Sequence, residues 1–506
     1  MGSISAKFKL SQSLKIAVTA SFAASLLASC QMPRPSQVPS LPLGRGLNQP
    51  LVGALGLPKT NQQFMWGVSS AGYQAEGGET NSQWYHWEKA GKTKDICGKA
   101  VDFYNRYEED ILLAKQMGVN SFRLSVEWSR IEPEPGKIDL QQLAYYKNLI
   151  QTVRKHGMEP LVTLIHFTYP HWLDIDADKD GVTGWEDPDT VDHFLNYASL
   201  VARELSPDVK YWITFNEPNI WLPLSHLAGK MPPGGKSIFG LLRAARNVLQ
   251  AHARVYDRIH GIRKDAMVSS NIFQFQYNPF ARRASTFAAQ ANAMSEKTIQ
   301  HFTNSDWFME AFEDGKFAYE PHLNQYFKAS HFKGGVAAMN NSVYSLLGRF
   351  DYVAFDYYYR FNTIDQVLHA DQTWRMPIYP QGLYNVLMSY HRRFRKPIVI
   401  AENGIANFNG NPREDGWKRP DHLVQHVYNM QSAMADGANV LGYYHWSITD
   451  NYEWGNYDSR FGLYSVEALK DPELKRIPTD GVAAYQAVIQ GQGTNPTMVT
   501  RFPGPR

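Results

Sequence analysis

The sequence predicts a single α/β barrel of eight parallel strands, the (β/α)8 or TIM-barrel class, with long loops on its C-terminal face. Eight segments are rich in β-branched and aromatic residues, and they end near residues 69, 128, 167, 215, 275, 357, 401 and 447. Helical patterns separate most of these segments. The chain has 506 residues, which is enough for one such barrel with extended loops.

The overall composition is that of a globular protein with a large core. Hydrophobic residues make up 43% of the chain and aromatic residues 13%. The formal net charge is only +3, so the charge gives no support for nucleic acid as a partner.

Residues 1–29 are predicted to be a targeting segment that does not belong to the fold. Lysines up to Lys15 precede an apolar run of small residues from Ile16 to Leu27, which is too short to span a membrane. The run ends in Leu-Ala-Ser-Cys, which resembles the lipobox of bacterial lipoproteins, so Cys30 is expected to be the acylated first residue of the mature chain. A plain signal peptide with an incidental cysteine is the alternative.

The remaining chain divides into three predicted parts. Residues 30–59 are rich in Pro, Gly and Ser without helical or strand periodicity, which indicates a tether. Residues 60–492 carry all eight strand patterns and are predicted to form the barrel, and residues 493–506 a C-terminal tail.

Two glutamates follow buried strand patterns directly. Glu217 ends Lys-Tyr-Trp-Ile-Thr-Phe-Asn and is followed by Pro218, which cannot continue a strand ladder. Glu402 ends Lys-Pro-Ile-Val-Ile-Ala and is followed by Asn-Gly. In a parallel barrel both would lie at the C-terminal face, where catalytic groups gather. Each alone could be a solvated acid at a strand end, but the pair indicates acid/base chemistry.

The motifs Thr-Phe-Asn-Glu-Pro and Glu-Asn-Gly resemble the acid/base and nucleophile motifs of glycoside hydrolase family 1, the β-glucosidase and β-galactosidase family. The resemblance runs from about Phe64 to about Ile489, with the motifs in family order. It implies that Glu217 is the acid/base residue and Glu402 the nucleophile of a retaining glycosidase that needs no cofactor. Arg123 would hold Glu402 ionised.

The same resemblance assigns residues that contact the sugar. Trp446 would form the floor under the ring, and Glu453, Trp454 and Phe461 would recognise its hydroxyls. Trp374 would be the platform for the leaving group, although its spacer is about two residues longer than in the family. The full set of expected substrate-binding residues is Gln74, His166, Asn216, Tyr358, Trp374, Trp446, Glu453, Trp454 and Phe461.

Three other departures from the family pattern concern this site. Phe167 stands where tryptophan is usual, and the spacing before Phe461 is one residue short. Asp356 stands where asparagine is usual and adds a third acid near the pair. A third carboxylate raises the pKa of a neighbouring acid unless an arginine neutralises it, and the sequence leaves both outcomes open.

One acidic stretch falls outside the family pattern. Asp176, Asp178 and Asp180 alternate before Gly181, and Asp187 is at position twelve, which is the ligand spacing of a calcium loop. Such loops prefer glutamate at position twelve. We expect either a structural Ca²⁺ or a solvated acidic loop.

The predicted function is therefore that of a retaining β-glycosidase acting on terminal β-D-glucosyl, galactosyl or fucosyl residues of small β-glycosides, oligosaccharides or glycolipids. An alternative is a membrane-associated transglycosidase acting on glycolipids, because several stretches also resemble the plant branch that remodels galactolipids. A catalytically silent carbohydrate-binding lipoprotein is disfavoured, since both glutamates are present. The lipidated Cys30 would place the protein at the bacterial cell envelope, on the periplasmic or surface face of a membrane.

Overall fold

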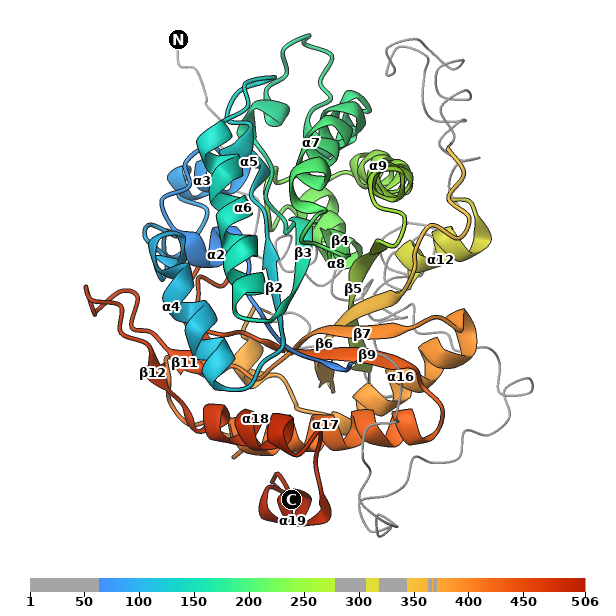
Figure 1. Ribbon diagram of the computed structural model, residues 1–506. Coiled ribbons are helices and arrows are strands. Elements are labelled where there is room, and N and C mark those ends of the chain that lie inside the picture. The colour runs from blue at the N-terminus through green and yellow to red at the C-terminus, as the bar shows by residue number, and fades with distance from the viewer. Residues whose placement is uncertain (1–62, 278–305, 318–343, 363–365, 367–370, 506) are drawn as a thin grey trace, which may run out of the picture.

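A computed structural model describes residues 63–277, 306–317, 344–362, 366 and 371–505. Within this part, eight parallel strands close into a barrel in the order β1-β2-β3-β4-β5-β6-β7-β9, and helices surround it (Figure 1). The (β/α)8 prediction is confirmed. The barrel strands are β1 (Met65–Ser69), β2 (Ser121–Ser125), β3 (Glu159–Ile165), β4 (Tyr211–Asn216), β5 (Met267–Tyr277), β6 (Val353–Phe361), β7 (Ile398–Asn403) and β9 (Val440–Trp446).

The described residues form eight longer helices, and each lies between two consecutive barrel strands except α18, which follows the last strand, β9. They are α4 (Phe103–Gln116), α6 (Leu140–Lys155), α7 (Asp189–Leu205), α9 (Ile238–Ile262), α12 (Trp307–Asp314), α16 (Pro380–Phe394), α17 (Arg419–Ala435) and α18 (Asp480–Gln490). The loops contain shorter helical elements, which are α2 (Gly72–Glu76), α3 (Gln83–Lys89), α5 (Trp128–Ile131), α8 (Pro218–Leu222), η1 (His171–Asp174), η2 (Gly184–Glu186), η3 (Pro223–Leu227) and η5 (Thr373–Arg375). Two small antiparallel pairs, β8 (Asn407–Phe408) with β10 (Ser459–Arg460) and β11 (Tyr464–Ser465) with β12 (Ile477–Pro478), complete them.

One strand is shorter than its pattern predicts. The alternation continues to Trp128, but β2 ends at Ser125 and Trp128 begins helix α5. Trp128 is buried against Tyr197 of α7, with ring centroids 5.1 Å apart. Burial therefore explains the apolar pattern without an extended backbone.

Two apolar layers stabilise the barrel. One fills its interior near the N-terminal ends of the strands and includes Leu161, Ile213, Val399 and Tyr444. The larger layer lies between the outer faces of the strands and the helices. Because the interior below is packed with apolar side chains, the polar residues on the inner faces gather at the C-terminal ends of the strands.

The C-terminal residues pack against the barrel. Helix α19 (Pro496–Arg501) lies against α17 (Figure 1), and Gln425 of α17 donates a hydrogen bond to the carbonyl of Phe502 at 2.6 Å. None of the helices in the described ranges is both long and apolar enough to cross a membrane. The predicted signal segment, Cys30 and the whole of the predicted tether lie outside the described residues.

Candidate active site

Three buried carboxyl groups meet at the C-terminal end of the barrel. They belong to Glu217, Asp356 and Glu402, and each contributes an oxygen that lies within 4.8 Å of the other two. Glu217 follows β4, Asp356 lies on β6 and Glu402 lies on β7. The two glutamates that the sequence singled out are therefore neighbours in space, although 185 positions separate them (402 − 217).

Irregular strand register turns these side chains inward. Between β6 and β7, Phe355 pairs with Ile400 but Asp356 pairs with Glu402, so β7 contains one extra residue. Side chains alternate along a regular strand, and the extra residue brings Glu402 level with Asp356 on the inner face. Strand β4 has a similar shift, which sets Asn216 beside Asn271 of β5.

The backbone at Glu217 makes a sharp turn from strand to helix. Its φ is +42°, and its amide donates to the carbonyl of Asn271 at 2.9 Å. Helix α8 begins at Pro218, whose missing N–H costs nothing in the first turn. The turn holds the carboxyl of Glu217 at the mouth of the barrel, where the side chain is buried.

Glu402 receives the strongest hydrogen-bond donors of the site. Arg123 forms an ion pair with one of its carboxylate oxygens, and the hydroxyl of Tyr358 donates to the other. The same guanidinium donates to Asn216 Oδ1 at 2.6 Å. All four side chains are buried, so the charge attraction is weakly screened.

The two glutamates differ in their expected protonation. Burial raises the pKa of Glu217 well above its usual range, and the nearby negative charge of Glu402 raises it further. Burial also raises the pKa of Glu402, but Arg123 and the hydrogen bond from Tyr358 oppose this shift. Glu217 therefore keeps its proton while Glu402 is ionised, which is the division of labour that an acid and a nucleophile need.

The predicted sugar-binding residues gather beside the carboxyls. Trp446 Nε1 donates to Glu453 Oε1 at 3.1 Å. The ring of His166 is nearly parallel to the rings of Trp446 and Trp454, and its centroid lies 5.8 Å and 5.9 Å from theirs. Gln74 donates to the carbonyl of Tyr452, next to Glu453, at 2.9 Å.

Two buried polar atoms in this group lack a protein partner. Gln74 Oε1 and His166 Nδ1 make no hydrogen bond to the described residues. Asn216 Oδ1 accepts from Arg123 and Asn271, so its Nδ2 must face His166 Nε2, at 3.2 Å. His166 Nε2 then accepts, and the neutral ring carries its proton on Nδ1. An acceptor and a donor thus stand ready for the hydroxyls of a ligand.

An aromatic group forms the other side of the site. Phe461 lies edge-on to Tyr358, with centroids 5.6 Å apart, and both belong to the buried cluster that contains Trp446. Trp374 of η5 packs against this cluster from outside and is only half-buried. Trp374 is therefore partly accessible beside this cluster, as a platform for a leaving group requires.

Sequence reasoning missed one member of the site. Asn271 of β5 is fully buried and donates to Asn216 Oδ1 at 2.8 Å and to Asp356 Oδ2. Strand β5 alternates polar and apolar residues, so the sequence did not single out Asn271 among its polar positions. Its side chain links β4 to β6 and fixes the orientation of both neighbours.

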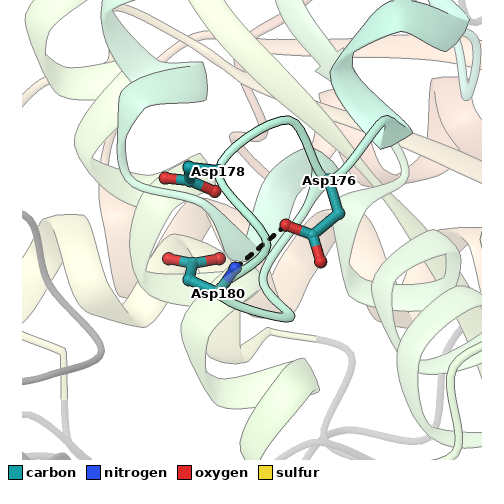
Figure 2. A group of neighbouring side chains, drawn as sticks. All are labelled: Asp176, Asp178 and Asp180. Atoms are coloured by element: carbon teal, nitrogen blue, oxygen red, sulfur yellow. Dashed lines mark hydrogen bonds between the residues drawn. The ribbon is translucent and has the colours of Figure 1, made fainter.

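The structure brings three of the four predicted calcium ligands together. Carboxylate oxygens of Asp176, Asp178 and Asp180 lie within 4.8 Å of one another on an exposed loop (Figure 2). Asp176 accepts from the backbone amides of Asp180 and Gly181, both at 3.1 Å. Asp187 does not join them, because η2 intervenes and its Oδ1 accepts the amide of Asp189 at the start of α7. Calcium binding stays a prediction.

Comparisons with known proteins agree with this geometry. The model of the family "Glycosyl hydrolase family 1" matches residues 58–367 and 360–494. The chain belongs to glycosyl hydrolase family 1. It is therefore an O-glycosyl hydrolase, as the two strand-end glutamates predicted.

Several family 1 enzymes are similar over most of the chain. Beta-glucosidase A of Acetivibrio thermocellus is 30% identical over 466 residues, covering 85% of this chain and 98% of the relative. The beta-galactosidase of Pyrococcus woesei is 28% identical and covers 85% and 97%. Among solved structures, the family 1 β-glucosidase of Thermotoga maritima matches with a TM-score of 0.72 and 28% identity, covering 86% of this chain and all of that one.

Proposed function

We propose that this enzyme hydrolyses terminal β-D-glucosyl, galactosyl or fucosyl residues with retention of configuration, through a covalent glycosyl-enzyme. The observation that carries the proposal is the close pair of carboxyls with unequal surroundings: Glu402 forms an ion pair with Arg123, and among the described residues Glu217 forms none. Oxygens within 4.8 Å agree with the ~5–5.5 Å separation of carboxyls in retaining enzymes and not with the ~6.5–9.5 Å of inverting ones.

In the first step, ionised Glu402 attacks the anomeric carbon of the sugar. Protonated Glu217 donates its proton to the glycosidic oxygen as that bond breaks, so the aglycone leaves as a neutral alcohol. Arg123 and the Tyr358 hydroxyl hold the attacking carboxylate in place. The products of this step are the glycosyl ester of Glu402 and an ionised Glu217.

In the second step, water releases the sugar. Glu217 takes a proton from the water, the water oxygen attacks the anomeric carbon, and Glu402 leaves as a carboxylate. Formation of the ester removes the negative charge of Glu402, which lowers the pKa of Glu217 and suits it to act as a base. The chemistry uses no cofactor.

The surrounding residues account for recognition of the sugar. We assign Trp446 to the face of the ring and Glu453, together with Gln74, to its hydroxyls. Burial raises the pKa of Glu453 to about 8, so this residue can both donate and accept a hydrogen bond near neutral pH. His166, Asn216, Trp454 and Phe461 complete the sugar site, and Trp374 supplies a surface for the aglycone.

The choice of gluco and galacto sugars rests on the relatives, and the fuco sugar is included only because the sequence resemblance does not separate these epimers. The enzymes compared above carry the names β-glucosidase and β-galactosidase, and one T. maritima structure holds galacto-hydroximolactam. Transglycosylation between glycolipids stays an alternative prediction, because none of the relatives named above carries that activity in its name.

We also propose, from the sequence alone, that a lipid on Cys30 anchors the enzyme at the bacterial cell envelope. The support is the lysine-apolar-cysteine order of the first thirty residues and the tether that follows. Radiolabelled fatty acid that enters the wild-type chain but not Cys30→Ala, with loss of the membrane-bound fraction, is the expected result. Equal labelling of both chains would contradict the anchor.

The test of the catalytic proposal follows the products by NMR. The purified chain is given aryl β-glucoside, β-galactoside and β-fucoside, with a glucolipid and a galactolipid in parallel. We expect the β-anomer of the free sugar to appear first. Initial formation of the α-anomer would contradict retention, and sugar transfer between lipids without free sugar would favour the alternative. Glu402→Gln is the inactive control, and Glu134→Gln, on an exposed turn, is the matched control.

A further inference from the structure

The steps above leave Asp356 without a role. This side chain is fully buried, and one of its oxygens lies within 4.8 Å of oxygens of both Glu217 and Glu402. Its Oδ2 accepts a hydrogen bond from Asn271, whereas Oδ1 accepts none from the described residues. Burial of an ionised carboxylate with one oxygen that accepts no hydrogen bond is unfavourable in free energy. Protonation of that oxygen removes the charge and most of this penalty.

The charges around Asp356 point to the same protonation state. Arg123 is the one cationic side chain in the described surroundings, and Glu402 already pairs with it. If all three acids were ionised, the site would carry two uncompensated negative charges in a water-poor environment. The titratable groups that face this region are Arg123 from β2, His166 after β3, Glu217 after β4, Tyr358 and Tyr359 from β6, Glu402 from β7 and Glu453 after β9.

The other neighbours add no positive charge. Burial and Arg123 hold the pKa of His166 well below its usual range, so its ring is neutral. Burial raises the pKa of Tyr358 well above its usual range and keeps its hydroxyl protonated. One guanidinium can therefore balance one carboxylate, and the hydrogen bonds assign it to Glu402.

We propose that Asp356 is a neutral carboxylic acid at the working pH and that its O–H donates a hydrogen bond to the carboxyl of Glu217. Asp356 is thus a positioning residue that acts through the acid/base group. In support, burial raises the pKa of Asp356 well above its usual range, and Glu402 and Glu217 raise it further. The inference rests on the proposed double displacement and adds a residue to it.

If Asp356 is neutral, one negative charge offsets the positive charge of Arg123 at every stage of the reaction. In the free enzyme, Glu217 and Asp356 are protonated and Glu402 offsets Arg123. In the glycosyl-enzyme, Glu402 is an ester and ionised Glu217 offsets Arg123, while Asp356 still holds its proton. The O–H of Asp356 then donates to the new carboxylate of Glu217 and stabilises it until water arrives. No proton leaves Asp356 during the cycle.

The kinetic test compares two substitutions in the full chain. Asp356→Asn keeps the shape, the neutral charge and a donor, and Asp356→Ala removes the donor. We expect the basic limb of the kcat/KM–pH profile to stay within about half a pH unit in Asp356→Asn. In Asp356→Ala it should rise by about one unit, because ionised Glu217 loses a hydrogen bond. A basic limb that falls by one unit or more in Asp356→Asn would show that a negative charge had been removed, and would overturn the proposal.

Infrared spectroscopy tests the proton without any substrate. The difference spectrum of wild type minus Asp356→Asn at neutral pH should contain the carbonyl band of a protonated carboxyl. For the matched control, the spectrum of wild type minus Asp265→Asn should instead contain a carboxylate band. Asp265 is ionised at neutral pH because Arg263 holds the pKa of its exposed carboxyl below the usual range. A carboxylate band in the Asp356 difference would overturn the proposal. Since this readout needs no turnover, it separates failure of the inference from failure of the proposed function.

Discussion

The described part of the molecule contains two close groups of three acids with opposite surroundings. In each group the carboxylate oxygens lie within 4.8 Å of one another, but Glu217, Asp356 and Glu402 are buried whereas Asp176, Asp178 and Asp180 are exposed. The loop is open to solvent, and the backbone amides of Asp180 and Gly181 also donate to Asp176, so its charges are exposed to solvation. At the barrel mouth burial prevents solvation by water. One guanidinium can then balance the charge of one ionised acid, and the other acids are expected to be protonated. We infer that desolvation, and not the clustering of acids, suits the buried group to acid/base chemistry.

The largest expected effect of breaking the buried group is loss of the nucleophile. Glu402→Gln should lower kcat/KM on aryl β-glucosides by at least about 10⁴-fold, because no covalent intermediate can form. Asp178→Asn in the exposed group should leave the rate unchanged. Measurement of initial rates, with circular dichroism to verify folding, checks both. Comparable losses of kcat/KM in Glu402→Gln and Asp178→Asn would contradict the distinction between the buried and the exposed group.

Replacement of the acid/base residue should show a loss that depends on the leaving group. Glu217→Gln is expected to lower kcat/KM by roughly 10²–10⁴-fold for aglycones that need protonation. With a dinitrophenyl glycoside, the rate of the first step should fall far less, since this leaving group is stable as an anion and needs no proton. Azide should restore turnover and give the β-glycosyl azide. A loss independent of the leaving group would speak against Glu217 as the acid.

Removal of the cation should change both stability and the pH profile. Arg123→Gln leaves Glu402 buried without its partner, and we expect a loss of about 3–5 kcal/mol in the free energy of unfolding, measured in urea. Burial then raises the pKa of Glu402 without opposition from Arg123, so the acid limb of kcat/KM should move to higher pH. The destabilisation should shrink as pH falls, because protonation removes the buried charge. An unmoved acid limb would contradict the pairing.

The smallest expected effect belongs to the exposed group. If the loop binds Ca²⁺, millimolar calcium should raise the thermal midpoint by a few degrees in wild type and not in Asp176→Asn, with no change in rate. Differential scanning fluorimetry with and without a chelator measures this. Equal midpoints in all four conditions would leave the loop as a solvated acidic turn.

The sequence predicted most of the fold because the barrel strands are buried on both faces. Such strands give continuous apolar runs, and Glu217 and Glu402 stand out at the ends of two of them. The prediction placed the end of β2 too late, because Trp128 is a buried residue of helix α5 and its apolar side chain extends the strand pattern. Apolar character reports burial, and not the backbone conformation that achieves it.

The parts of the site that escaped prediction depend on register and charge. The extra residue in β7 that sets Glu402 beside Asp356 leaves no mark in composition or periodicity. Asn271 lies within an alternating strand, and its role depends on which residues β4 and β6 place next to it. The sequence revealed Asp356 as a third acid but left its charge open, because that charge depends on Arg123 being committed to Glu402. Asp187 has the spacing of a ligand, but η2 carries it away from the loop.

The most direct test of the account is to trap the glycosyl-enzyme. The chain is incubated with the dinitrophenyl glycoside of 2-deoxy-2-fluoro-β-glucose, whose fluorine slows the second step more than the departure of the activated leaving group. Peptide mass spectrometry then locates the attached sugar. We predict stoichiometric labelling on Glu402 and on no other residue. A label on Glu217 or Asp356, or steady turnover with no label, would contradict the assignment of Glu402 as the nucleophile that Arg123 holds ionised.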